Sequence, residues 1–178
     1  MCGIAGIAGT RPIHTDTVKT MTDLLAHRGP DDRGIWTSPD GQISFGHRRL
    51  SIIDTSSAGH QPMVKDASVI TYNGELYNYI ELRNRLQSEG SEFNSSSDTE
   101  VVLESYRRWG ENCVSEFNGM FAFAIFDADR NSLFCARDRF GEKPFLYSQQ
   151  DEFFAFASEY KALLNLEGIS HEIDDTKL

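Results

Sequence analysis

An uninterrupted apolar run in the second half of the chain, GMFAFAIF at residues 119–126, places the strongest constraint on the fold. A strand with one solvent-facing side alternates apolar and polar residues, whereas a strand that is covered on both sides does not. The run therefore predicts a central strand that is buried on both faces. A sheet that contains such a strand needs a further layer of structure on each side.

Strands and amphipathic helices are predicted on both sides of this run. Apolar spacing predicts one helix around residues 18–25, a second around 79–86 with Gly90 as its stop, and a third after Ser97. Ser97 and Glu100 form a capping-box pattern, and the serine-rich segment before them is predicted to be a loop. Further strands are predicted at residues 3–9, 43–48, 69–72, 132–137, 144–148 and 153–157, and a loop at residues 27–34. This order of elements indicates an α+β fold, in which helices pack outside antiparallel sheets.

Bulk composition excludes several classes of protein. The 178 residues fit one domain, and a net charge of -10 argues against a nucleic acid or an anionic membrane as the partner. No apolar segment approaches the roughly 20 residues that cross a bilayer. The three cysteines, Cys2, Cys113 and Cys135, suit neither a disulfide framework nor a zinc site, and the five histidines lack metal-ligand spacing. A cytoplasmic protein without a bound metal is expected, with Cys113 and Cys135 as inert thiols.

A cysteine directly after the initiator methionine is the most informative single residue. Aminopeptidases remove Met1 when the next residue is small, which leaves Cys2 with a thiol and a free α-amine. An α-amine has a reference pKa of ~7.7–8.0, so it can be largely neutral near physiological pH and can accept the thiol proton. One residue then supplies both the nucleophile and the general base, as an amino-terminal threonine does.

Two alternatives to catalysis by Cys2 remain open. A small residue at position two is common in chains where it has no catalytic role. If Met1 is retained, its amide bond to Cys2 removes the base, and the chain would act as a catalytically silent docking or regulatory module of the same fold.

Nine short motifs connect the chain to a known family. The motifs are MCGIAG (1–6), HRGPDDRG (27–34), GHRRLSIID (46–54), GHQPM (59–63), YNGELYNY (72–79), SDTEV (97–101), GMFAFAIFD (119–127), ARDRFGEKP (136–144) and FASEYKAL (156–163). In these motifs and their order the chain resembles the class II glutamine amidotransferases, and most of all the glutamine-hydrolysing asparagine synthetase type. The resemblance implies the N-terminal-nucleophile hydrolase fold, an αββα sandwich of antiparallel sheets between helical layers.

The resemblance also implies how glutamine would be hydrolysed. Cys2 attacks the side-chain amide, and the oxyanion that forms is held by the side-chain amide of Asn73 and the backbone N–H of Gly74. One such donor is typically worth ~2.7–4 kcal/mol. The alternative interpretation of Asn73 and Gly74 is a plain Asn-Gly hairpin turn.

Two charged side chains would bind the two charged groups of a free amino acid. Arg49 would bind the α-carboxylate with its planar guanidinium, while the neighbouring Arg48 is expected to be a solvated surface charge. Asp98 would pair with the α-ammonium. Asp98 could instead cap the third helix, although Ser97 can cap it and leave the Asp98 carboxylate free. Peptide-bound glutamine lacks both charges and should be rejected.

Four more residues are expected near the substrate. Glu75 would either help to hold the ammonium or be structural, and these alternatives are rated evenly. Leu50, Ile52 and Ile53 would present backbone and an apolar wall to the substrate's methylenes, or would simply be strand core.

The resemblance further implies partners that these residues do not supply. The domain spans residues 1–178 and needs no metal or cofactor for glutamine hydrolysis. The ammonia would pass to a C-terminal synthetase domain or a separate synthetase subunit, which uses ATP and magnesium in asparagine biosynthesis. That domain's pyrophosphate-binding motif is absent from this sequence. The final ammonia acceptor and a homo-oligomer are left open, and so is a different N-terminal-nucleophile hydrolase that acts on another amide.

Overall fold

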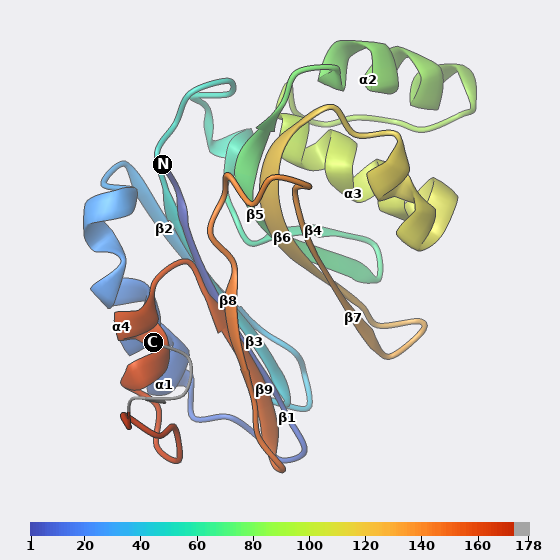
Figure 1. Cartoon of the computed structure of the whole chain (residues 1–178). Coiled ribbons are helices and arrows are strands. Elements are labelled where there is room, and N and C mark those ends of the chain that lie inside the picture. Colours follow the sequence, from blue (N-terminus) through green and yellow to red (C-terminus); the bar gives the residue numbers. More distant parts are fainter. Residues whose placement is uncertain (173–178) are drawn as a thin grey trace.

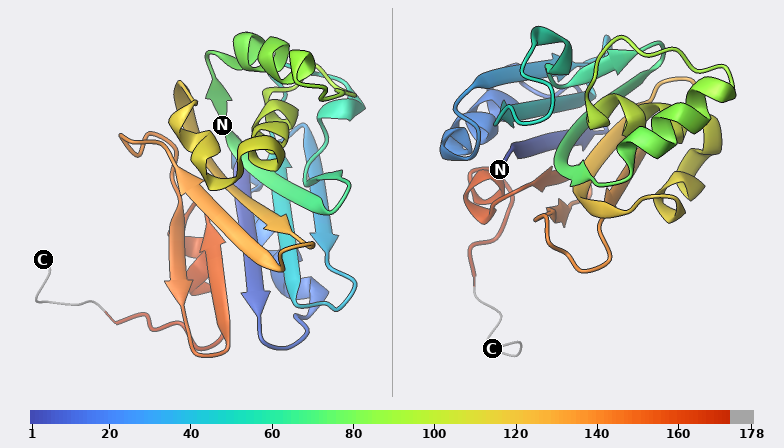
Figure 2. Two further views of the ribbon diagram at one scale, coloured as in Figure 1. Left: turned by 90° about the vertical axis from the view of Figure 1, so that its right-hand side faces the viewer. Right: turned by 90° about the horizontal axis from the view of Figure 1, so that it is seen from above.

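Two antiparallel β-sheets face each other at the centre of the molecule, and helices cover their outer faces (Figure 1). The computed structural model describes residues 1–172, so the last six residues of the predicted 1–178 domain lie outside the described part. Seen from above, the sheets lie between α1 and α4 on one side and α2 and α3 on the other (Figure 2). This helix–sheet–sheet–helix order confirms the predicted α+β architecture.

The first sheet has five strands in the order β2-β3-β1-β9-β8. Every neighbouring pair in it is antiparallel. The helices α1 and α4 pack on its outer face. The bounds are β1 (Gly3–Gly9), α1 (Thr15–Leu24), β2 (Asp32–Thr37), β3 (Ile43–Arg49), β8 (Leu146–Gln149), β9 (Phe153–Ala157) and α4 (Tyr160–Leu164), with a 3₁₀ turn at Ala26–Arg28.

The second sheet has four strands in the order β4-β5-β6-β7, again all antiparallel. The helices α2 and α3 cover its outer face. The bounds are β4 (Met63–Lys65), β5 (Ser68–Leu76), α2 (Tyr79–Ser88), α3 (Asp98–Trp109), β6 (Gly119–Asp127) and β7 (Ser132–Arg137), with 3₁₀ turns at Ser57–Gly59 and Gly110–Ser115.

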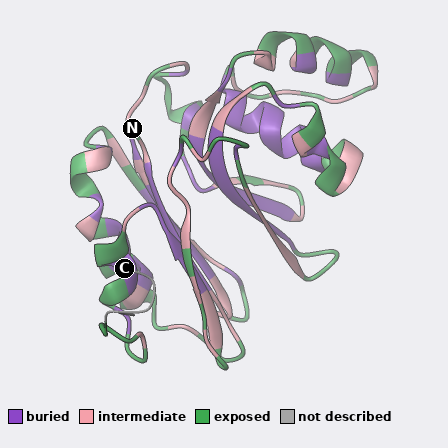
Figure 3. Cartoon of the chain, viewed as in Figure 1, coloured by how far each residue is buried: buried purple, intermediate pink, exposed green. Residues whose placement is uncertain are grey.

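Strand β6 is covered on both faces, as its sequence predicts, and its two faces differ in residue size. Phe121, Phe123 and Ile125 belong to the cluster under α2 and α3, whereas Ala122 and Ala124 belong to the cluster between the two sheets. Side chains alternate along a strand, so large residues fill the space under the helices and small ones let the sheets approach. The central strands are mostly buried, and the outer helix surfaces are exposed (Figure 3).

Gly6 of β1 lies between the aromatic side chains of the two neighbouring strands of its own sheet, Phe45 of β3 and Phe156 of β9. A Cβ atom at position 6 would come within 2.5 Å of the Phe156 ring and 2.9 Å of Phe45. The Phe45 and Phe156 rings themselves meet edge to face with centroids 5.7 Å apart. Only glycine fits here, because the packed rings leave no room for a side chain.

Several sequence-based boundaries were wrong. The loop predicted at residues 27–34 contains a 3₁₀ turn and the start of β2, and the strand predicted at 69–72 continues to Leu76. The capping box forms only in part. Ser97 Oγ accepts from the Thr99 N–H as expected. The Glu100 carboxylate instead accepts from the N–H groups of Asn94 and Ser95. The short elements β4 and α4 were missed.

A buried histidine makes a polar contact between the two sheets. His47 of β3 is fully buried, and its Nε2 lies 3.0 Å from the Tyr72 carbonyl oxygen of β5. A carbonyl only accepts, so Nε2 carries the proton. Burial lowers the pKa of His47 to about 4, because a charged imidazolium would lose its hydration. The side chain is therefore neutral at physiological pH.

We expect His47 to make the fold less stable in acid. The folded pKa of about 4 lies below the ordinary value of 6.5, so its contribution is complete above pH 6.5 and is lost as the pH falls towards 4. Between pH 7 and pH 5 the loss should be about 2 kcal/mol in the free energy of unfolding. Urea unfolding at both pH values should show a smaller loss in His47→Gln. Equal losses in the two proteins would contradict this account, and His171→Gln, at an exposed position, is the control.

Candidate active site

A cavity of about 240 Å³ is lined by residues from the amino terminus, the end of β3, the edge of β5 and the start of α3. Figure 1 shows the amino terminus at the upper end of the first sheet. All the site residues that the sequence predicts line this one cavity. They are Cys2, Arg49, Leu50, Ile52, Ile53, Asn73, Gly74, Glu75 and Asp98. The fold thus brings together residues that are up to 96 positions apart, from Cys2 to Asp98.

Cys2 stands just before β1, with its thiol against the segment that follows β3. The Leu50 N–H donates to Cys2 Sγ at 3.4 Å, and Sγ lies 3.6 Å from the Leu50 carbonyl oxygen. Burial raises the pKa of the Cys2 thiol, and the Leu50 N–H lowers it by less. The thiol is therefore protonated at neutral pH and needs a base before it can attack an electrophile.

Arg28 holds the backbone of Cys2 from the other side. Its Nε donates to the Cys2 carbonyl oxygen at 2.9 Å, and its Nη1 donates to Glu159 Oε1 at 3.0 Å. This contact holds the Cys2 backbone in place just before β1. Sequence reasoning gave Arg28 no role, because the residues that it touches are distant in the chain. Its place in the HRGPDDRG motif was the only signal.

Asn73 and Gly74 lie inside strand β5, so the interpretation as a plain hairpin turn was wrong. Asn73 is 2% exposed, and within residues 1–172 its Nδ2 is a buried donor without an acceptor. A buried amide donor without an acceptor is costly, by ~1–3 kcal/mol. A donor without an acceptor in a cavity wall can donate a hydrogen bond to an oxygen atom of a bound molecule.

The Gly74 N–H belongs to a row of amides on one edge of β5. The Tyr72 N–H donates to Gln61 Oε1 at 2.7 Å, and the Leu76 N–H donates to Asp98 Oδ2 at 3.1 Å. Amide directions alternate along a strand, so the Gly74 N–H points to the same side, between these two. Strand β4 pairs only with residues 68–70 and does not cover this stretch.

Position 74 has no space for a side chain. A Cβ atom there would lie 2.6 Å from the Met120 carbonyl oxygen and 2.7 Å from the ring of Tyr72. A substitution would push against the Tyr72 ring, whose hydroxyl binds Asp98 at 2.8 Å. Glycine is therefore required at this position by close packing rather than by a turn.

Strand alternation separates the two adjacent arginines at the end of β3. Arg49 shares the inward face with Phe45 and His47, is 7% exposed, and donates through Nη1 to the Ser56 carbonyl oxygen at 2.8 Å. Arg48 points the other way, towards α1, and donates to the Thr22 carbonyl oxygen at 3.1 Å. It also pairs with Asp23, so the prediction that Arg48 is a solvated surface charge was wrong.

Asp98 is the first residue of α3 and is 5% exposed. Ser97 caps the helix, so the Asp98 carboxylate is not needed as the cap. The predicted capping by Ser97 and the predicted pairing of Asp98 with an ammonium group therefore both fit the geometry. Asp98 Oδ2 accepts from the Tyr72 hydroxyl and from the Leu76 N–H. Burial nevertheless raises the pKa of Asp98, because these two bonds do not fully replace water. A cation bound beside this carboxylate would relieve that cost.

Comparison with known proteins assigns the family. A model of the glutamine amidotransferase domain matches residues 1–178. The chain belongs to this family. It is 45% identical to asparagine synthetase [glutamine-hydrolyzing] 3 of Bacillus subtilis and 40% identical to a putative asparagine synthetase of Methanocaldococcus jannaschii. These alignments cover 100% and 96% of this chain but 30% and 36% of the relatives, so the chain spans about a third of their length.

A solved structure supports the fold of this amidotransferase domain. Glutamine phosphoribosylpyrophosphate amidotransferase from Bacillus subtilis aligns with a TM-score of 0.78 at 24% identity, over 91% of this chain and 43% of that chain. The predicted N-terminal-nucleophile hydrolase fold is confirmed, and the family is one of enzymes. At this identity the likeness describes the fold alone.

The segment after β3 forms one wall of the cavity in the amidotransferase domain. Leu50, Ile52 and Ile53 lie beyond the end of the strand, and Ile52 is 68% exposed, so their interpretation as strand core was wrong. Glu75 is half-buried at the cavity wall, and either of its two predicted roles fits this position.

Gln61 was missed as a site residue, although the GHQPM motif contains it. It is 4% exposed and joins β5 to α3, since its Oε1 accepts from the Tyr72 N–H and its Nε2 donates to Thr99 Oγ1 at 3.2 Å. It therefore helps to set the distance between Asn73 and Asp98. No local pattern in the sequence signals such a bridging role.

Among the described residues, the remaining titratable groups form no second reactive site or metal site. Burial raises the pKa of Cys113 and of Cys135 to about 12, which agrees with the prediction that they are inert thiols. Within residues 1–172, no group of three or more His, Cys, Asp or Glu side chains converges as a metal site would require. None of the helices in the same range is long and apolar enough to cross a membrane.

We expect Asp98→Asn to make the domain more stable at neutral pH. The raised pKa means that the folded state disfavours the charged form of Asp98, and an amide can still accept from Tyr72 without that charge. The free energy of unfolding should rise on the order of 1 kcal/mol at pH 7, and the gain should shrink as the pH falls towards the ordinary pKa of Asp. Chemical denaturation measures it, with the exposed Asp129→Asn as control. A loss of stability at pH 7 would contradict this reasoning.

Proposed function

We propose that this domain hydrolyses free L-glutamine to L-glutamate and ammonia, with Cys2 as the nucleophile. One observation carries the proposal. The Cys2 thiol, the orphan amide donor of Asn73 and the Gly74 edge of β5 line the same cavity as Arg49 and Asp98, which carry opposite charges. A free amino acid with a side-chain amide matches this combination of groups.

The reaction begins when the α-amine of Cys2, freed by removal of Met1, takes the thiol proton. Burial keeps the thiol protonated, so a base on the same residue is needed. The thiolate attacks the side-chain carbonyl carbon, ammonia leaves with a proton returned by the amine, and a γ-glutamyl thioester remains. Water then attacks the thioester and releases glutamate.

The tetrahedral intermediate carries an oxyanion that needs fixed donors. The Asn73 side-chain amide is buried and lacks an acceptor in the described chain, and the Gly74 N–H points towards the uncovered edge of β5. Both donors are held by a strand, so they do not reorganise during the reaction. Such preorganised donors are the main source of rate enhancement in acyl transfer.

Recognition of the substrate depends on its two charged ends. The Arg49 guanidinium would bind the α-carboxylate, and Asp98 would bind the α-ammonium and thereby recover its own burial cost. The backbone and side chains of Leu50, Ile52 and Ile53 would line the path of the methylenes, while Glu75 would help to hold the ammonium or be structural. A glutamine residue inside a peptide offers neither charge.

The ammonia would serve an asparagine-synthetase-type domain or subunit that uses ATP and magnesium. Support comes from the relatives that are named glutamine-hydrolysing asparagine synthetases, of which this chain matches about a third. The ATP-dependent step would belong to that other domain, since the relatives so named extend well beyond the part that this chain matches. A relative named amidase chry2 of Gibberella zeae, 37% identical, leaves other ammonia acceptors open.

Retention of Met1 would produce the silent-module alternative. The Met1 side chain lines the cavity, and Lys143 Nζ lies 3.4 Å from its sulfur atom. The intact mass of the purified protein decides between the two functions. A mass without methionine supports the enzyme, and a mass with methionine supports the docking or regulatory module.

We expect Cys2→Ala to abolish glutamate release while glutamine binding remains. The thiol forms the covalent bond, whereas Arg49 and Asp98 provide the affinity. A coupled glutamate assay and calorimetry measure the two properties. Cys113→Ala, which changes a buried thiol outside the cavity, is the control for activity. Unchanged turnover in Cys2→Ala would refute the mechanism.

We expect Asn73→Ala to lower kcat by about 10²–10³-fold with little change in KM, because the oxyanion forms only in the transition state. Asn112→Ala, in the 3₁₀ turn after α3, should leave both constants unchanged. A pure increase in KM for Asn73→Ala would mean that Asn73 binds the substrate and does not stabilise the oxyanion.

Asparagine and peptidyl-glutamine serve as alternative substrates in the same assay. Equal rates on glutamine and on peptidyl-glutamine would contradict the roles of Arg49 and Asp98.

A further inference from the structure

The Asp54 carboxylate joins two loops beside the cavity, the turn that follows β3 and the segment before α3. Its Oδ1 accepts from the Ser56 N–H at 2.9 Å and the Ser56 hydroxyl at 2.6 Å. Its Oδ2 accepts from the Ser96 N–H at 3.0 Å and the Ser96 hydroxyl at 3.1 Å. Asp54 is 8% exposed, so these four bonds replace most of its hydration.

One end of this connection is the turn that holds Arg49. The Arg49 guanidinium donates to the backbone carbonyl oxygens of Asp54 and Ser56, so it binds the same two residues that the Asp54 carboxylate organises. Because the carboxylate oxygens are already filled by serine donors, Arg49 meets carbonyl dipoles rather than a negative charge. Its positive charge stays available for an incoming carboxylate.

The other end of the connection lies two residues before Asp98. Ser96 receives the Asp54 bonds, Ser97 caps α3, and Asp98 begins that helix. The serine-rich segment predicted as a plain loop is therefore ordered by specific bonds. Each of its last three serines has a hydrogen-bond partner. Ser95 Oγ donates to Glu100 Oε2 at 2.7 Å, and the partners of Ser96 and Ser97 are Asp54 and the Thr99 N–H.

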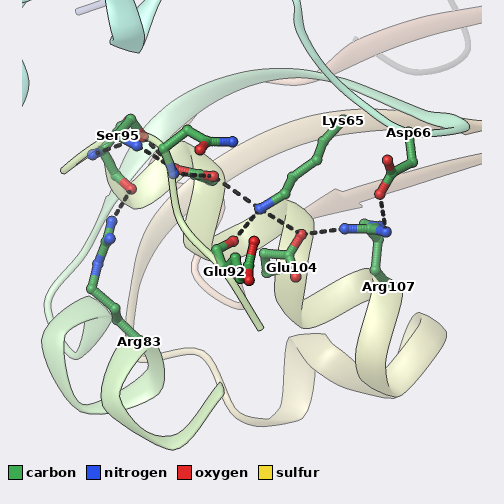
Figure 4. Close-up of polar contacts among 10 residues, drawn as sticks. Lys65, Asp66, Arg83, Glu92, Ser95, Glu104 and Arg107 are labelled. Atoms are coloured by element: carbon green, nitrogen blue, oxygen red, sulfur yellow. Dashed lines mark hydrogen bonds and ion pairs between the residues drawn. The ribbon is translucent and has the colours of Figure 1, made fainter. Parts of the chain in front are cut away.

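An ion-pair network holds the same loop at Asn94 and Ser95. Glu100 accepts from the Asn94 and Ser95 N–H groups, and Lys65 pairs with Glu100 and Glu104 at 3.0 Å each. In Figure 4, Lys65 points between Glu92 and Glu104, and Ser95 lies on the loop above them. The loop is thus fixed to α3 from this side and to Asp54 from the other.

We propose that Asp54 is a positioning residue that sets the separation between Arg49 and Asp98, and so makes the site specific for a free amino acid that carries both a carboxylate and an ammonium group. The inference rests on the proposed function of this cavity. Two charges on separate elements of the fold can bind one small molecule well only if their spacing is fixed, and a misplacement of about 1 Å can cost ~10²-fold in rate.

The charge on Asp54 persists over the range of pH in which the domain would work. The Ser56 hydroxyl, together with the N–H groups of Ser56 and Ser96, lowers the pKa of Asp54 to about 2. Loss of this connection by titration is therefore not expected near neutral pH. Only a change of side chain breaks it.

Asp54→Asn is the variant that tests the proposal, because it keeps the shape but replaces one carboxylate oxygen with an NH₂ group, which would face a serine N–H that needs an acceptor. Calorimetry with L-glutamine in a Cys2→Ala background should show affinity reduced at least ~10-fold. In chains that keep Cys2, KM for L-glutamine should rise by a similar factor. Turnover of L-glutamine α-amide, which lacks the carboxylate, should change much less, so the preference for L-glutamine over its α-amide should fall.

Ser96→Ala, which removes one of the four bonds, should show a smaller change in the same direction. Ser115→Ala, at an exposed serine after α3, should leave affinity and preference unchanged. A merely structural role for Asp54 would lower activity on both substrates equally by reducing the folded fraction. That result, or unchanged glutamine affinity, would overturn the proposal.

The assay also separates this inference from the proposed function. If a chain with Cys2 and without Met1 binds glutamine but releases no glutamate, the proposed hydrolysis fails while the calorimetry still tests Asp54. If Cys2→Ala does not bind glutamine at all, the inference about Asp54 is overturned directly.

Discussion

The site depends on the part of strand β5 that extends beyond its short neighbour β4. Backbone amides at a buried sheet edge need acceptors, and β4 covers only residues 68–70. Further along, a side-chain amide from the loop before β4 and a carboxylate from α3 satisfy the Tyr72 and Leu76 N–H groups. The Gly74 N–H between them is left facing the cavity. The missing strand partner thus produces both the anchor for Asp98 and the proposed oxyanion donor.

The central architecture could be predicted from the sequence because its signals are local. The apolar run 119–126 predicted a strand covered on both faces, and helical spacing predicted α1, α2 and α3. Strand β4 and helix α4 were missed because three and five residues are too few to show a period. Strand β2 was missed because Gly34 and its charged neighbours resemble a loop.

The candidate site was predicted from motifs rather than from spacing, and the cavity brings all of its predicted residues together. The residues that support them were not predicted. Arg28 acts on Cys2, Gln61 on Tyr72 and Thr99, and Asp54 on Ser96, and each contact joins segments that are far apart in the chain. Such contacts exist only after folding, so no periodicity or short motif can reveal them.

The alternating sizes along β6 have a consequence for chemistry. Ala122 and Ala124 face the first sheet, and their small size lets the two sheets approach closely. The proposed nucleophile is carried by one sheet and the proposed oxyanion donors by the other. The thickness of the apolar core between the sheets therefore acts as a spacer for the reacting groups, and a larger residue deep in that core would lengthen the attack distance without touching the cavity.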